Sequence, residues 1–122
     1  MGKIKLFKNN AAIDAAIWTK DKVVEGVSRY SGRRLEEIAF IGDEIIDLSV
    51  IRTPGLGFVG APSNAQDRVK EEVRNLSYGY VSDKRVFEGF LDFYEKAMNR
   101  GIKLIISGWV SYRSRTLINI QL

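Results

Sequence analysis

Short apolar runs alternate with amphipathic stretches along most of this 122-residue chain, and that alternation constrains the fold more than any other feature. The runs have the length of strands, and they are residues 4–7, 38–41, 56–59 and 102–106; the run 38–41 is apolar throughout, as a strand covered on both faces requires. The amphipathic stretches predict helices, and they are residues 20–30, 45–51, 63 or 64 to 76, and 84–100. Strands separated by helices form parallel sheets. We therefore predict an α/β fold, a parallel Rossmann-like sheet with helices on both faces.

Single residues predict where the helices begin and end and which faces they bury. Gly32 and Gly101 follow the first and last helices, where glycine readily takes the left-handed conformation. Ser63 or Asn64 can cap the third helix. The residues expected on apolar faces are Val23, Val24, Val27 and Tyr30 in the first helix, Val69 and Val73 in the third, and Phe87, Phe90, Leu91, Tyr94 and Met98 in the last.

The composition excludes several kinds of chemistry. The chain has no cysteine and no histidine, which excludes disulfides, thiolate metal sites and imidazole bases. A net charge of +4 favours anionic ligands, but the basic residues are scattered, and we expect no nucleic-acid partner. No signal-peptide pattern opens the chain, and no apolar run approaches the roughly 20 residues of a membrane span. We therefore expect a cytoplasmic protein without a membrane partner.

Three acids, Asp43, Glu44 and Asp47, closely follow the apolar run 38–41. Ligands of open parallel sheets bind at the carboxyl ends of the strands, and Gly42 permits a tight turn at that point. Carboxylates held there suit Mg²⁺, which takes hard oxygen ligands, usually one or two carboxylates with phosphate and water. Alternatively, Asp43 caps the next helix and the other two acids favour its positive end, which requires no ligand. The residues alone leave both interpretations open.

Residues 38–73, IAFIGDEIIDLSVIRTPGLGFVGAPSNAQDRVKEEV, resemble the fourth motif of the haloacid dehalogenase (HAD) superfamily together with its following strand and helix. The resemblance runs from about residue 20 to residue 98 and points to the small cap-less phosphatases similar to 3-deoxy-manno-octulosonate 8-phosphate phosphatase. It implies a Mg²⁺-dependent phosphatase whose substrate is a small phosphorylated sugar. It also implies a homo-oligomer, because in these enzymes a neighbouring subunit helps to close the site.

The resemblance assigns roles to individual residues. Lys20 matches the lysine that offsets phosphate charge, with Lys22 as the alternative; without the resemblance, Lys20 is an ordinary surface lysine. Asp43 would hold Mg²⁺, and Asp47 would be a further metal-site acid or a structural acid. Ser107 would bind phosphate if the last predicted strand leads into the second motif of the family. The alternatives are that 107–108 ends a core strand in a Ser-Gly turn, or stands where the first strand of the family ends in Ser-Asp.

The chain departs from the family at the nucleophile. The family carries an Asp-x-Asp-Gly motif, whose first aspartate is phosphorylated and whose second is the general acid and base, and no two aspartates of this chain are two positions apart. The chain also begins about where the family is halfway through its domain. We therefore expect an incomplete HAD-like domain over 1–108 and a strand or tail over 109–122. The alternative function is a non-catalytic HAD-like remnant that acts as a binding or structural module.

Overall fold

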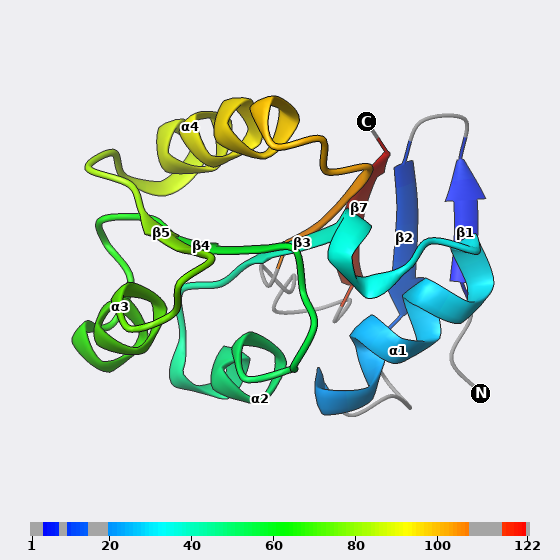
Figure 1. Cartoon of the computed structure of the whole chain (residues 1–122), viewed down its shortest axis with the longest axis horizontal. Coiled ribbons are helices and arrows are strands. Elements are labelled where there is room, and N and C mark those ends of the chain that lie inside the picture. Colours follow the sequence, from blue (N-terminus) through cyan, green and yellow to red (C-terminus); the bar gives the residue numbers. More distant parts are fainter. Residues whose placement is uncertain (1–3, 8–9, 15–19, 108–115, 122) are drawn as a thin grey trace.

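The chain forms one seven-stranded sheet with helices packed against it, as seen in a computed structural model that describes residues 4–7, 10–14, 20–107 and 116–121, with side chains from Val24 to Ser107 (Figure 1). The strands are β1 Ile4–Phe7, β2 Asn10–Asp14, β3 Ile38–Ile41, β4 Phe58–Ala61, β5 Gly79–Val81, β6 Leu104–Ser107 and β7 Thr116–Gln121. The α-helices are α1 Lys20–Ser31, α2 Leu48–Ile51, α3 Asp67–Arg74 and α4 Val86–Asn99. Two single 3₁₀ turns are η1 Leu35–Glu37 and η2 Ile45–Asp47.

Four neighbouring strands, in the order β6-β3-β4-β5, are all parallel. Helix α4 covers one face of this part of the sheet, and α1, α2 and α3 lie on the other face (Figure 1). These elements confirm the predicted α/β fold, a parallel Rossmann-like sheet with helices on both faces, in a partial form. The carboxyl ends of all four strands consequently meet along a single edge.

The other three strands, β7, β2 and β1, are antiparallel and extend the same sheet beyond β6. The antiparallel pairing and strand β2 were not predicted, whereas β1 matches the strand expected over 4–7 and β7 lies in the segment expected as a strand or tail. Strand β7, from the segment 109–122, pairs with both β6 and β2. Strand β6 therefore lies inside the sheet, parallel to β3 on one side and antiparallel to β7 on the other.

The core is divided into two layers by the alternation of side chains along the strands. In β3, Ile38 and Phe40 face the helices α1, α2 and α3, whereas Ala39 and Ile41 face α4. All four residues are at most 2% exposed. Burial on both faces explains why the sequence of β3 is a continuous apolar run rather than an alternating one.

Gly60 in β4 allows α4 to approach the sheet closely. A Cβ atom at this position would lie 2.2 Å from the ring of Phe93 on α4. That ring stacks on Phe58 with centroids 4.7 Å apart and planes at 2°. Glycine is therefore required by packing at the centre of the α4 layer.

Two of the predicted helix features were wrong in whole or in part. Helix α3 begins at Asp67 with Gln66 at its N-cap, so neither Ser63 nor Asn64 caps it. Helix α4 buries a face that only partly matches the expected one: Phe90 is buried and Tyr94 is partly buried as predicted, but the other buried residues are Gly89, Phe93 and Ala97. Phe90 and Phe93 fill the space between the helix and the sheet, and the remaining apolar side chains point away from it. Those exposed side chains are Phe87, Leu91 and Met98, and Tyr30 of α1 is exposed as well.

A polar network fastens α4 to the β5 edge of the sheet. Asp92 on α4 accepts hydrogen bonds at one oxygen from the Tyr80 hydroxyl and the Ser82 hydroxyl, each at 2.6 Å. Its other oxygen lies 3.6 Å from the Lys96 ammonium. The hydrogen bonds from Ser82 and then Tyr80 hold the pKa of Asp92 below its usual value. The bond to Asp92 in turn raises the pKa of Tyr80 to about 12.

We predict that Asp92→Asn lowers the free energy of unfolding by about 2 kcal/mol at neutral pH, because two hydrogen bonds to a charged group are weakened. A lowered aspartate pKa gives stability that is complete above about pH 4 and is lost as the pH falls through the folded-state value. A raised tyrosine pKa gives stability that is lost as the pH rises from about 10 towards 12. Urea unfolding across pH checks both limbs. Glu95→Gln, an exposed site on the same helix, should leave the pH profile unchanged.

None of the helices in the described residues combines the length and the apolar character that crossing a membrane requires.

Candidate functional site

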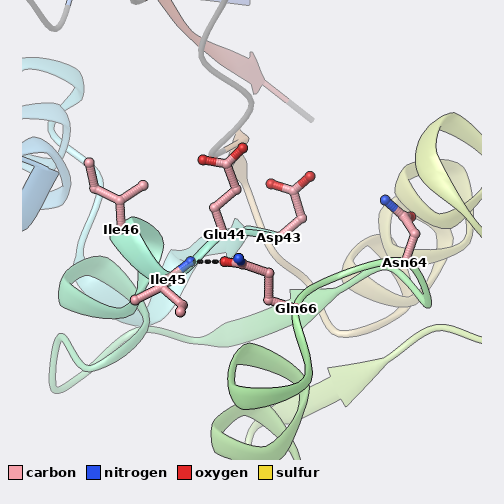
Figure 2. A pocket seen from close by; sticks show the side chains of 6 residues that line it. All are labelled: Asp43, Glu44, Ile45, Ile46, Asn64 and Gln66. Atoms are coloured by element: carbon pink, nitrogen blue, oxygen red, sulfur yellow. Dashed lines mark hydrogen bonds between the residues drawn. The ribbon is translucent and has the colours of Figure 1, made fainter.

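An open cleft of about 580 Å³ lies at the edge where the parallel strands end. One wall is the loop and turn after β3, and the other is the loop after β4 that leads into α3 (Figure 2). The lining residues are Asp43, Glu44, Ile45, Ile46, Asn64 and Gln66. This is the edge at which ligands of open parallel sheets bind, so the cleft is the candidate site.

The three successive backbone amides of the loop after β3 are all bonded to side-chain oxygens. Asp47 Oδ2 accepts from the amides of Asp43 at 3.0 Å and Glu44 at 3.1 Å. Gln66 Oε1 accepts from the amide of Ile45 at 2.6 Å. A run of backbone amides that bind an anion must point at the ligand, and these point at protein oxygens instead. The loop therefore presents carboxylates to the cleft and does not form an anion-binding nest.

Asp47 is part of the frame of this loop. Its side chain is 0% exposed, and its Oδ2 atom makes the two amide contacts just described. Gly42 makes room for it, because a Cβ atom there would lie 2.7 Å from the Cβ of Asp47. The geometry thus gives Asp47 a structural role, one of the two predicted for it. Its role as a metal ligand stays a prediction.

The side chains of Asp43 and Glu44, which are adjacent in the chain, project to the same side of the loop (Figure 2). Asp43 is half-buried and Glu44 is exposed. Two adjacent carboxylates at an open strand end fit Mg²⁺, which binds hard oxygen ligands and retains several waters. Within the part of the chain that the structure describes, no group of three or more acidic, histidine or cysteine side chains is suited to a metal. The fit to Mg²⁺ rests on this pair.

Asn64, on the opposite wall, ties the loop after β4 to the start of α4. Its Oδ1 accepts from the Val86 amide at 2.7 Å, and the Ser63 amide donates to the Lys84 carbonyl at 2.8 Å. Because an amide donor requires an oxygen, this contact directs the Nδ2 of Asn64 away from Val86. Val86 itself has φ 46°, an uncommon conformation for a β-branched residue. The sequence predicted that Asn64 could cap α3, but its side chain instead bonds the first residue of α4, whose N-cap is Arg85.

The other predicted site residues are only partly placed. Lys20 is the first residue of α1, as predicted, but its side chain and that of Lys22 lie outside the described residues, so their phosphate role stays a prediction. Ser107 is the last residue of β6, is 3% exposed and pairs in register with Ile41. The carboxyl end of β6 therefore lies beside the loop that carries Asp43. No protein-family model, curated protein or solved structure matches this chain.

Proposed function

We propose that this chain carries the cation-binding part of a Mg²⁺-dependent phosphatase of the HAD type, which acts on a sugar phosphate and here lacks its nucleophile. The observation that carries the proposal is the loop after β3. All three of its amides are bonded within the protein, and the carboxylates of Asp43 and Glu44 are directed into an open cleft. Such a loop suits a cation more than an anion.

The residues of the chain would divide the work as follows. Asp43, supported by Glu44, would hold the cation at the strand end. Lys20, at the start of α1, would offset charge on the phosphate, a role that suits a flexible ammonium group. Bound Mg²⁺ supplies Lewis-acid stabilisation of the phosphoryl oxygens. Asp47 keeps the loop in shape from below.

The remaining walls of the cleft suit a sugar. Ile45 and Ile46 are 49% and 61% exposed and offer apolar surface to a ring. Asn64 offers amide hydrogens for hydroxyl or phosphate oxygens, because its oxygen is already bonded to Val86. We therefore propose a small phosphorylated sugar as the substrate of this cleft. We also propose that the chain acts as a homo-oligomer.

We further propose that β6 occupies the place of the central first strand of the family. It is parallel to β3, and its last residue, Ser107, is level with Ile41. The next residue is Gly108, where the family would have the aspartate nucleophile. In this interpretation the chain has the framework of the active site, and its missing carboxylates come from another domain or chain.

The proposal predicts weak Mg²⁺ binding at Asp43. Octahedral Mg²⁺ gains much of its affinity from complete geometry and a bound phosphate, and this chain supplies only one or two carboxylates. The melting temperature should therefore rise only at millimolar Mg²⁺, and Asp43→Asn should abolish the rise. Glu95→Gln removes an exposed acid from α4, which lies on one face of the sheet, and should leave the Mg²⁺-dependent rise in melting temperature unchanged.

Two outcomes of this titration would contradict the account. A rise at micromolar Mg²⁺ that Asp43→Asn removes would mean that the site is already complete. The absence of a rise at any concentration would favour the second candidate function, a non-catalytic module. That candidate is supported by Asp47, a strand-end acid that serves the fold without a ligand.

A further inference from the structure

Gln66 contacts the loop after β3 at two points. Its backbone amide donates to the carbonyl of Asp43 at 2.9 Å, and its side-chain Oε1 accepts from the amide of Ile45 at 2.6 Å. The two contacts lie on either side of Glu44 in the chain. Figure 2 shows the Gln66 side chain beneath this loop, with its oxygen directed at Ile45. Gln66 thus bridges the start of α3 and the acidic wall of the cleft.

The ordinary role of a residue at this position does not explain the contact. Gln66 is the N-cap of α3, and its side chain makes no cap hydrogen bond to that helix. The residues preferred at N-caps are Asn, Asp, Ser and Thr, whose short side chains reach the first amides of their own helix. The longer glutamine side chain extends instead to an amide 21 positions earlier in the sequence. Its contact serves the loop and not the helix.

Gln66 and Asp47 hold adjacent parts of the same loop. The Asp47 carboxylate accepts from the amides of Asp43 and Glu44 within the core, and Gln66, from the loop after β4, accepts from the next amide, that of Ile45. Without Gln66 the first two amides keep their partner, so the loop stays attached to the core. The Ile45 amide loses its partner, and the backbone that follows Glu44 is then held by the bonds of η2 itself, from the Asp47 amide to the Glu44 carbonyl and from the Leu48 amide to the Ile45 carbonyl.

We propose that Gln66 is a positioning residue, which fixes the direction of the Asp43 and Glu44 carboxylates and so sets their affinity for a divalent cation. This inference rests on the proposed cation-binding function. Gln66 would not contact the cation itself. Its effect is geometric, because removing its oxygen leaves both carboxylates in the chain but lets the backbone between them and η2 relax.

The test compares two variants of the full chain with a control. Gln66→Met keeps the length of the side chain and removes the acceptor, whereas Gln66→Glu keeps an acceptor oxygen. Asn75→Met changes an exposed residue at the other end of α3. Hydrogen exchange of the Ile45 amide reports the contact directly, and amide chemical shifts during a Mg²⁺ titration report cation affinity. Melting without cation reports the fold.

We expect Ile45 exchange to be faster in Gln66→Met by roughly fivefold to tenfold, the equivalent of one lost hydrogen bond, with Mg²⁺ affinity weakened by a similar factor. The melting temperature without cation should change little, because Gln66 is exposed. Gln66→Glu should retain slow exchange, and Asn75→Met should match the wild-type chain in all three measurements.

The possible outcomes distinguish the positioning role of Gln66 from the proposed cation-binding function on which it rests. Unchanged Ile45 exchange in Gln66→Met would overturn the contact. Faster exchange with unchanged Mg²⁺ affinity would overturn the positioning role and leave the cation site standing. A wild-type chain that shows no Mg²⁺-dependent shifts would overturn the proposed function, and the positioning role with it.

Discussion

This chain alone is expected to release no inorganic phosphate from sugar phosphates in the presence of Mg²⁺. HAD-type hydrolysis requires a carboxylate in line with phosphorus and a second acid for the leaving oxygen, in addition to a cation and a lysine. In the proposed function, Lys20 and Asp43 would supply only the last two. Phosphate monoesters are among the slowest of uncatalysed hydrolyses, so electrostatic groups without a nucleophile leave turnover undetectable.

The assay should include a panel of sugar phosphates and the variant Asp43→Ala. Turnover by the wild-type chain that disappears in Asp43→Ala would contradict the account, because another acid would then have to act as nucleophile or base. Glu44 would be the first candidate, since it is exposed in the cleft. Asp47 is a weaker candidate, because its side chain is fully buried and one of its carboxylate oxygens accepts hydrogen bonds from two backbone amides.

The second large effect is a gain of turnover when an Asp-x-Asp-Gly sequence follows β6. Residues 107–111 read Ser-Gly-Trp-Val-Ser, and the triple substitution Gly108→Asp, Val110→Asp and Ser111→Gly gives the family motif directly after Ser107. Because β6 is parallel to β3 and Ser107 is level with Ile41, a nucleophile at this strand end would be introduced beside Asp43. We expect Mg²⁺-dependent phosphate release many orders of magnitude above the uncatalysed rate.

Two controls keep this gain interpretable. Gly108→Asn, Val110→Asn and Ser111→Gly together introduce side chains of matched size without carboxylates, and this variant should stay inactive. A separate domain that carries an Asp-x-Asp-Gly strand, mixed with the wild-type chain, tests whether the carboxylates can come from another chain. Turnover in that mixture should be lost when Lys20 is changed to alanine.

Elements with a strong local signal were predicted from the sequence. Strand β3 was predicted with its exact bounds, because four apolar residues are followed at once by Gly42. Helix α1 begins at Lys20, and Gly32 follows its last residue with φ 73°. Strands β2 and β5 were missed. Strand β2, Asn-Ala-Ala-Ile-Asp, contains one large apolar residue, so it gives no strand signal. Strand β5 is only three residues long, and all three residues are half-buried.

Features that depend on tertiary contacts were beyond the sequence. The buried face of α4 was predicted only in part, with Phe90 and Tyr94 correct, because apolar residues surround much of the helix and the approach to Gly60 selects the face with Phe93. The sequence correctly placed the acids directly after β3. It did not show that Asp47, and not Asp43, accepts the hydrogen bonds from the loop amides, because this depends on the folded backbone. Gln66 carried no signal at all, since its partner Ile45 is 21 positions away.

Phosphate release by the triple variant, Gly108→Asp with Val110→Asp and Ser111→Gly, tests the central claim most directly. The claim is that Lys20, Asp43 and the end of β6 are the framework of a phosphatase active site. The account predicts Mg²⁺-dependent turnover of at least one sugar phosphate, lost on adding either Lys20→Ala or Asp43→Asn. A triple variant that keeps the cooperative unfolding and Mg²⁺ response of the wild-type chain but releases no phosphate would contradict it.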